Sequence, residues 1–385
     1  MKRILFIDFC NYKDYQIGGH LSFAKSLMCA FENQLSLIGI TTDKKDRLGR
    51  WIKKEIDGVE YDFFALTRYD KSKTKHFIPD RISCILLLRR YKNKILKMNF
   101  QNVFVQRPEV LPAIKDFGYK NICYCFPGTE NALKTSKYWF GRYGASWFDK
   151  LFFSSLKDVK LILASADENA ILSMVQRSNG TLTRQSIIKF PTRINTDIYK
   201  PTDKRFARET LGIPISKKVV ITVGRLSWLK GWKLMIDSFV LLEKKMPGSI
   251  FYFVGGGEDS GKINEYISLN DLKEKVILVG VKKPDEISLY LNASDLFVMG
   301  SYKEGWSTSL MEAVACGIPV CVTNFSAASD IIQVGVNGYI EEKWDMNEFS
   351  NLMLKALALN INEVDISRYA ISNMKADILH DWVLY

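Results

Sequence analysis

The stretch DLFVMGSYKEGWSTSLMEAVACGIPVCVTN, from Asp295 to Asn324, decides the fold expected for this chain. Its two apolar runs, 295–301 and 318–324, are typical of buried strands. A helix is expected between them, because Ser309 and Glu312 have the spacing of a capping box, with Ser309 as the N-cap. Cys316-Gly317, followed by a proline, predicts where this helix ends. A strand, a helix and a strand in this order indicate a parallel sheet.

The same alternation runs through the whole second half of the chain. Apolar strands are expected at 217–224, 249–257 and 275–280, with helices at 232–246 and 284–294 between them. The first half shows similar strands and a basic amphipathic helix at 83–98. The segment 190–202 has linker character. We therefore expect an α/β protein with doubly wound parallel sheets, whose ligands bind at the carboxyl ends of the strands.

Length and composition indicate a globular protein of two domains. The chain has 385 residues, of which 47% are hydrophobic and 25% charged. It contains no apolar run of 18 residues, so no transmembrane helix is expected. The seven cysteines and three histidines lack the spacing of a zinc site, which favours free thiols in a reducing cytoplasm.

The net charge of +12 is unevenly distributed. Residues 1–200 contain 34 Lys and Arg against 19 Asp and Glu, whereas residues 201–385 contain 20 against 23. A basic half of this kind faces either an anionic membrane or nucleic acid, or is simply a solvated surface. The basic helix and the aromatic run 138–148 favour a membrane contact, but both are also compatible with core packing. No nucleic-acid recognition motif is present.

Two loops carry residues that suit an anionic ligand. The helix after Gly305 begins at the carboxyl end of a strand, so its free N–H groups and dipole would attract a phosphate. Arg225 and Lys230 follow another strand, between Gly224 and Gly231, and could bind phosphate oxygens. Alternatively, Arg225 and Lys230 are ordinary surface cations, Glu304 is a solvated loop residue and Glu312 only caps the helix. The run VGGGEDSG at 254–261 is a poor dinucleotide fingerprint and fits a tight strand-to-helix turn better.

These motifs together resemble the retaining glycosyltransferases with the GT-B fold, of the family-four type. The segments that carry the resemblance are VGRLSWLKGW at 223–232, FVGGGED at 253–259, VILVGV at 276–281, ASDLFVMGSYKEGWSTSLMEAVACGIPV at 293–320 and DIIQVGVNGYI at 330–340. The resemblance implies two Rossmann-like domains facing across a cleft: an acceptor-binding domain at 1–197 and a nucleotide-sugar-binding domain at 198–366. Residues 367–385 would form a C-terminal helix that crosses back to the first domain.

The resemblance also implies roles for individual residues. Arg225 and Lys230 would bind the donor diphosphate, Glu304 would contact the donor sugar near the reacting carbon, and Glu312 would bind the ribose hydroxyls. The remaining donor-site residues would be Gly18, Gly19, Gly224, Gly255, Val281, Lys282, Gly305, Trp306, Ser307, Thr308, Ser309 and Leu310, with Val281 and Lys282 near the nucleotide base. The sugar-contacting histidine of many members is absent from CYCFPGTEN at 123–131, where Pro127, Gly128 and Glu130 stand instead.

The function implied is transfer of a sugar, with retention, from a UDP-, GDP- or ADP-sugar to a glycan or lipid-linked acceptor. We expect a role in bacterial surface polysaccharide synthesis (lipopolysaccharide, O-antigen or capsule). No cofactor or metal is expected, because no metal–diphosphate motif is present. The expected location is the cytoplasm or the inner face of the membrane, with no nucleic-acid partner. The alternatives are a nucleotide-sugar epimerase or a phosphorylase on the same fold, and a basic nucleic-acid-binding protein.

Overall fold

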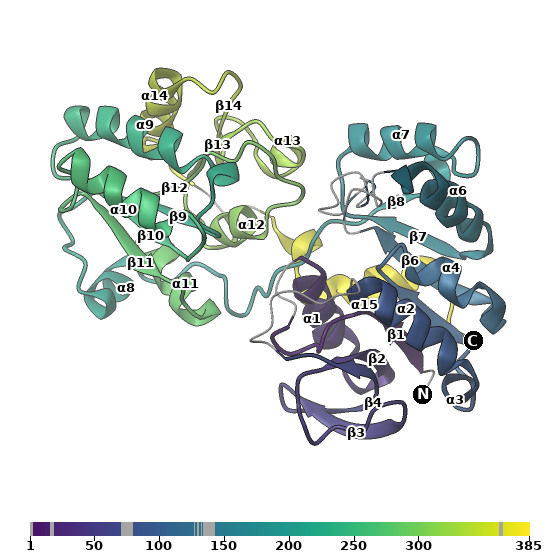
Figure 1. Ribbon diagram of the computed structural model, residues 1–385. Coiled ribbons are helices and arrows are strands. Elements are labelled where there is room, and N and C mark those ends of the chain that lie inside the picture. Colours follow the sequence, from purple (N-terminus) through teal and green to yellow (C-terminus); the bar gives the residue numbers. More distant parts are fainter. Residues whose placement is uncertain are drawn as a thin grey trace. The chain divides into compact units, whose positions relative to one another are not determined.

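The computed structural model describes residues 3–15, 19–70, 80–126, 128, 131, 133, 143–361 and 365–385 (Figure 1). The chain forms two compact units. Unit 1 comprises Met1–Arg193 and Ile371–Tyr385, and unit 2 comprises Ile194–Ala370. Within the described residues, no helix combines the length and the apolar character that crossing a bilayer requires.

Unit 1 is built on an eight-stranded sheet with the order β3-β4-β2-β1-β5-β6-β7-β8. Its strands are β1 (Ile4–Ile7), β2 (Leu35–Thr41), β3 (Trp51–Ile56), β4 (Val59–Arg68), β5 (Asn102–Val105), β6 (Asn121–Phe126), β7 (Leu161–Ala164) and β8 (Ile188–Lys189). All neighbours pair in parallel except β3 and β4, which form an antiparallel hairpin at one edge. The parallel part agrees with the sequence prediction, whereas the hairpin was not predicted.

The central strands of unit 1 are buried on both faces. Along β1, Leu5 and Ile7 belong to one hydrophobic cluster while Ile4 and Phe6 belong to the other. Successive side chains of a strand point to opposite faces, so this alternation places a hydrophobic layer on each side of the sheet. The sequence therefore reads as a continuous apolar run, as expected for a sheet covered by helices on both faces.

The helices of unit 1 lie on both sides of this sheet (Figure 1). They are α1 (Gly19–Phe31), α2 (Asp80–Arg90), α3 (Lys92–Leu96), α4 (Val110–Ile114), α6 (Ala145–Ser155), α7 (Glu168–Arg177) and α15 (Ile371–Asp381). The single helix predicted at 83–98 is wrong in one respect, because α2 and α3 are separate. Tyr91 interrupts them with a backbone conformation (φ −92°, ψ 6°) outside the helical range.

The C-terminal segment completes the core of unit 1. Helix α15 packs on α1, and its Met374 and Ile378 share a hydrophobic cluster with Leu27 of α1. Trp382, which follows the helix, is buried and donates a hydrogen bond from Nε1 to Oδ1 of Asn121 at 2.8 Å. The end of the chain is therefore an integral part of the unit formed by its beginning.

Unit 2 contains a six-stranded, wholly parallel sheet with the order β11-β10-β9-β12-β13-β14. Its strands are β9 (Val219–Val223), β10 (Ile250–Val254), β11 (Val276–Gly280), β12 (Leu296–Met299), β13 (Val320–Thr323) and β14 (Gly338–Glu341). Its helices are α8 (Lys204–Leu211), α9 (Trp232–Lys245), α10 (Ser260–Leu269), α11 (Pro284–Asn292), α12 (Thr308–Ala315), α13 (Ala328–Ile331) and α14 (Met346–Leu357). The strands and helices predicted for this half of the chain are confirmed.

The order of these strands creates one topological switch point in unit 2. The chain runs outward from β9 through β10 to β11, and then returns to place β12 on the other side of β9. The loops that follow β9 and β12 therefore start at adjacent strand ends, and residues of both loops line a small hollow. This is the position at which open parallel sheets bind their ligands.

Candidate functional site: the switch point of unit 2

Helix α12 begins two residues earlier than the sequence predicted. Ser307, not Ser309, is the N-cap: its backbone is extended and its Oγ accepts a hydrogen bond from the N–H of Leu310 at 3.3 Å. The predicted capping box between Ser309 and Glu312 is thus wrong, because Ser309 already lies in the first helical turn. Glu312 lies in the second turn and is not needed as a cap.

Lys230 and Glu304 meet at the switch point. Lys230 ends the loop that follows β9, and Glu304 lies in the loop that follows β12. The Lys230 Nζ contacts both carboxylate oxygens of Glu304, at 2.8 and 2.7 Å. These side chains are 26% and 18% exposed, so the pair is partly shielded but open to a ligand. The fold thus brings together two residues that the sequence predicted for catalysis.

Arg225 and Lys230 line the same small hollow. The hollow is lined by residues of the same loops, including Gly224, Arg225, Lys230 and Ser301, and has about 10 Å³ of water-accessible space. This is room for about one water molecule. The side chain of Arg225 is exposed, so its guanidinium is free to reach an incoming anion.

Ser301 is a polar residue of this hollow that the sequence analysis missed. It is fully buried, and its Oγ has no hydrogen-bond partner among the described residues. A buried hydroxyl without a partner is unfavourable unless a ligand or water satisfies it. Its place directly after β12, one residue beyond Gly300, was the only sequence signal that could have identified it.

Two close backbone contacts hold the loops of the site. Gly231 has a left-handed backbone (φ +64°), and a Cβ there would lie 1.8 Å from the carbonyl oxygen of Gly300. Gly255 has φ +144°, and a Cβ there would lie 1.9 Å from the carbonyl oxygen of Gly224. Only glycine fits such positions. The predicted site residues Gly224 and Gly255 therefore pack against each other at the ends of neighbouring strands.

Glu312 carries the clearest electrostatic signature in unit 2. Burial raises the pKa of its carboxyl group from 4.5 to about 7, and a hydrogen bond with Tyr199 acts in the opposite direction. In turn, burial and the Glu312 carboxylate raise the pKa of the Tyr199 hydroxyl. A partly buried carboxyl on a helix that starts at the switch point is a candidate ligand for hydroxyl groups, and perturbed groups of this kind cluster at functional sites.

The other predicted donor-site residues of unit 2 lie in the loop after β11, and in the loop and first turn that begin α12. Val281 and Lys282 follow β11 at the far edge of the sheet, where Val281 is exposed and Lys282 pairs with Glu286 at 3.3 Å. Gly305 is exposed, and Trp306 donates from Nε1 to the sulfur of Met311 at 2.7 Å. Thr308, Ser309 and Leu310 form the first turn of α12.

Several residues that the sequence analysis singled out belong to unit 1. Gly19 is the first residue of α1, and Gly128 is described, but Gly18, Pro127 and Glu130 lie outside the described residues.

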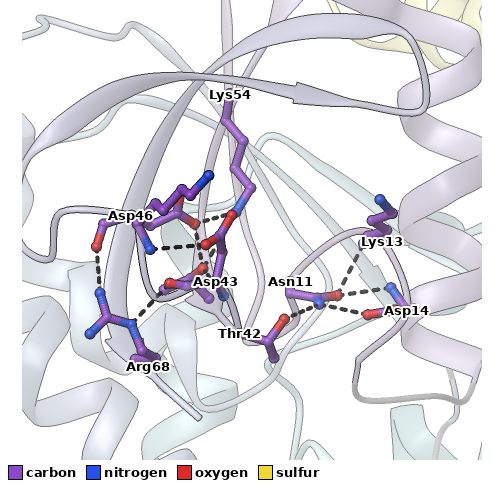
Figure 2. Close-up of polar contacts among 10 residues, drawn as sticks. Asn11, Lys13, Asp14, Thr42, Asp43, Asp46, Lys54 and Arg68 are labelled. Atoms are coloured by element: carbon purple, nitrogen blue, oxygen red, sulfur yellow. Dashed lines mark hydrogen bonds and ion pairs between the residues drawn. The ribbon is translucent and has the colours of Figure 1, made fainter. Parts of the chain in front are cut away.

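The loop that follows β1 is held by Asn11, whose Oδ1 accepts the backbone N–H groups of Lys13, Asp14 and Tyr15 at 2.8–3.0 Å. Its Nδ2 donates to Oγ1 of Thr42 at 3.1 Å (Figure 2).

Unit 1 has a polar cluster at its own switch point, which the sequence analysis did not identify. Asp8 follows β1 and Arg107 follows β5, and the Arg107 Nε donates to Oδ1 of the fully buried Asp8 at 2.7 Å. Gln106 donates to Asp8 and to the carbonyl oxygen of His20. Burial and the Arg107 charge lower the pKa of His20 to about 4, so its imidazole is neutral at pH 7.

Unit 2 matches a known protein family over most of its length. Residues 203–373 match the family described as Glycosyl transferases group 1. The chain is 26% identical over 189 residues to D-inositol 3-phosphate glycosyltransferase of Segniliparus rotundus, and 28% identical over 186 residues to mannosylfructose-phosphate synthase of Agrobacterium fabrum. These matches cover 46% and 45% of this chain, and only 42% and 40% of the length of the two relatives.

Solved structures of other proteins align with almost the whole of this chain. Sucrose-phosphate synthase from Thermosynechococcus elongatus aligns over 99% of this chain and 95% of its own, with a TM-score of 0.68 and 16% identity. HepE from Anabaena, in complex with UDP and glucose, aligns over 99% and 96%, with a TM-score of 0.65 and 16% identity. These likenesses show the class of fold: the chain has the GT-B fold. The match to the glycosyl transferases group 1 family lies almost entirely within unit 2 and covers 171 of the 385 residues.

Proposed function

We propose that this chain transfers a sugar from a nucleoside diphosphate sugar to a glycan or lipid-linked acceptor, with retention at the anomeric carbon. The observation that carries the proposal is the bidentate contact between Lys230 and Glu304 at the unit 2 switch point. The contact brings a cation suited to a diphosphate and a carboxylate suited to a sugar to one place. Arg225 and Ser301 line a hollow together with Lys230, and Glu304 lies four residues before Thr308, the first residue of α12.

The chemistry follows from the charges that develop as the sugar–phosphate bond breaks. Negative charge grows on the departing diphosphate, and positive charge grows on the sugar ring. Lys230, Arg225 and the N–H groups at the start of α12 would stabilise the diphosphate, and preorganised donors of this kind contribute strongly to catalysis. Glu304 would lie against the sugar. Because its carboxylate is already paired with Lys230, we assign it a binding and electrostatic role and not that of a covalent nucleophile.

The relatives support the substrate class and the biological setting of the proposal. HepE was solved with UDP and glucose, and another relative is named as an amylovoran biosynthesis glycosyltransferase from Erwinia amylovora. A further solved neighbour is the lipopolysaccharide outer core galactosyltransferase WaaB, with a TM-score of 0.64. We therefore propose a UDP-, GDP- or ADP-sugar donor and a role in bacterial surface polysaccharide synthesis. No metal or other cofactor is part of the proposed mechanism.

We also propose a peripheral contact between unit 1 and the inner face of an anionic membrane, through helix α2. Ile82 and Leu86 are one turn apart and are 42% and 59% exposed, and the partly exposed Arg89 follows in the next turn. Apolar and basic side chains of this kind suit a lipid–water interface. Flotation with phosphatidylglycerol vesicles tests the contact: Leu86→Glu should abolish binding, and phosphatidylcholine vesicles should bind neither protein. Equal flotation of wild type and variant would refute it.

The donor proposal is tested by thermal shift with UDP, GDP, ADP, CMP and their common sugar conjugates. A ligand at 100 times its Kd stabilises the folded state by about 2.7 kcal/mol. For a unit of this size, that corresponds to a shift of about 5–10 °C. One nucleotide should give this shift in the wild type and lose it in Glu312→Ala, while the exposed control Glu209→Ala keeps it. No shift with any nucleotide would contradict the proposal.

Product analysis separates transfer from the other reactions considered for this fold. With a labelled donor and a mixture of glycan and lipid-linked acceptors, a transferase moves the label to an acceptor. An epimerase would change the donor sugar without an acceptor, and a phosphorylase would require free phosphate. Salt-sensitive binding to duplex DNA, without binding of any nucleotide sugar, would instead favour a nucleic-acid-binding protein.

A further inference from the structure

Three aromatic rings gather on the loops of unit 2, two of them on the loops that carry Lys230 and Glu304. Trp228, Tyr302 and Trp344 lie on the loops that follow β9, β12 and β14. The rings of Tyr302 and Trp344 stack with centroids 4.3 Å apart and planes 6° apart, and the Trp228 ring lies 5.9 Å from that of Tyr302. We call these three residues the aromatic platform.

Much of the aromatic platform is open to solvent. Trp228 is 63% exposed and Tyr302 is 50% exposed. Because Trp344 stacks on Tyr302, Trp228 presents the largest free ring surface of the three. Large aromatic side chains are usually well buried, so neighbouring exposed rings next to a polar site indicate a binding surface.

The backbone holds the platform in place without a ligand. Trp344 has a left-handed backbone (φ 60°), which is unfavourable for a side chain of this size. The buried Glu341 carboxylate maintains it by accepting the N–H groups of Lys343 and Trp344 at 2.7 and 2.6 Å. The Tyr302 N–H donates to the carbonyl oxygen of Leu229 at 2.8 Å, which ties the first two loops together. The rings are thus preorganised, and binding need not order them.

The position of the platform favours the sugar end of a ligand over the base end. Trp228 is two residues before Lys230, and Tyr302 is two residues before Glu304. Val281, expected near the base, follows β11 at the opposite edge of the sheet from β14. A ligand with its diphosphate at Lys230 and its sugar at Glu304 would therefore bring a sugar ring, and not the base, toward Trp228.

We propose that the aromatic platform is a saccharide subsite, with the Trp228 ring stacking on the apolar C–H face of a pyranose. Aromatic rings combine a flat apolar face with a polar edge, which suits a ring whose C–H face is apolar and whose hydroxyls stay in water. The proposal rests on the function proposed above. It deepens that function by assigning sugar recognition to three residues outside the diphosphate site. The sugar comes either from the donor or from a glycan acceptor.

The test measures sugar binding in Trp228→Ala, Trp228→Phe and wild type. The probes are UDP, UDP-glucose and the trisaccharides maltotriose, cellotriose and chitotriose, with affinities measured by calorimetry and saturation-transfer NMR. Trp147→Ala is the matched control, because Trp147 is a comparably exposed (68%) tryptophan in unit 1. Circular dichroism confirms that each variant is folded. We expect Trp228→Ala to weaken sugar binding about tenfold, corresponding to about 1.4 kcal/mol, while Trp228→Phe and Trp147→Ala bind nearly as the wild type does.

The probes distinguish the source of the sugar. If the platform holds the donor sugar, Trp228→Ala weakens UDP-glucose about tenfold and leaves UDP unchanged. If it holds the acceptor, UDP-glucose is unchanged and trisaccharide binding to the UDP-saturated protein falls. Weaker binding of UDP itself, equal sugar binding by wild type and Trp228→Ala, or no sugar binding by the wild type would overturn the proposal. Trisaccharide binding that depends on Trp228, without any nucleotide binding, would support the platform and refute the donor site.

Discussion

The pKa of Glu312 makes a strong prediction about stability. Its carboxyl group has a pKa of about 7 in the folded protein and 4.5 as its ordinary value. Between pH 4.5 and 7 the unfolded chain has lost this proton while the folded protein retains it, so stability falls as the pH rises through this range. Each pKa unit corresponds to 1.36 kcal/mol, so a group shifted by about 2.5 units destabilises the ligand-free protein by roughly 3 kcal/mol above pH 7.

The substitution Glu312→Gln removes this titration while keeping the size of the side chain. We expect the free energy of unfolding of the variant, relative to that of the wild type, to increase by about 3 kcal/mol between pH 4.5 and 8.5. Urea unfolding followed by circular dichroism across this range measures the difference, in which all other titrating groups cancel. Glu209→Gln, at an exposed position of α8, is the matched control. A difference between Glu312→Gln and wild type that stays constant with pH would refute the reasoning.

Three further predictions follow from the site. Arg225→Ala should reduce turnover more than donor affinity, because the guanidinium would act on charge that develops as the diphosphate leaves; normal steady-state turnover would remove Arg225 from the mechanism. Gly231→Ala should destabilise the protein by about 3 kcal/mol or more, because its Cβ would meet the Gly300 carbonyl; thermal unfolding beside Gly305→Ala, which has open space, measures this. EDTA should leave the transfer rate unchanged, because Lys230 and Arg225 supply the positive charge; a rate lost with EDTA and restored by Mg²⁺ would contradict metal independence.

Sequence alone determined five strands of unit 2, β9 to β13, and the helices α9, α11 and α12, because the signals for them are local. Buried parallel strands are short apolar runs, and two of the predicted helices end next to Pro or Gly: α9 before Pro247, and α12 at Cys316-Gly317 before β13. The same local patterns predicted an anionic ligand at the loops after β9 and β12. They were weaker in unit 1, where the hairpin of β3 and β4 was not recognised and one helix was predicted instead of α2 and α3.

Only the tertiary structure decided which of these residues act together. Lys230 and Glu304 are 74 positions apart, and they meet because β9 and β12 are neighbours in the sheet. The burial of Glu312 and its contact with Tyr199 likewise depend on packing. The ion pair of Asp8 with Arg107 and the stacking of Tyr302 on Trp344 also depend on how the chain packs. Periodicity specifies each strand and helix from its own residues, whereas strand order is set by the free energy of packing the complete chain, which no single segment contains.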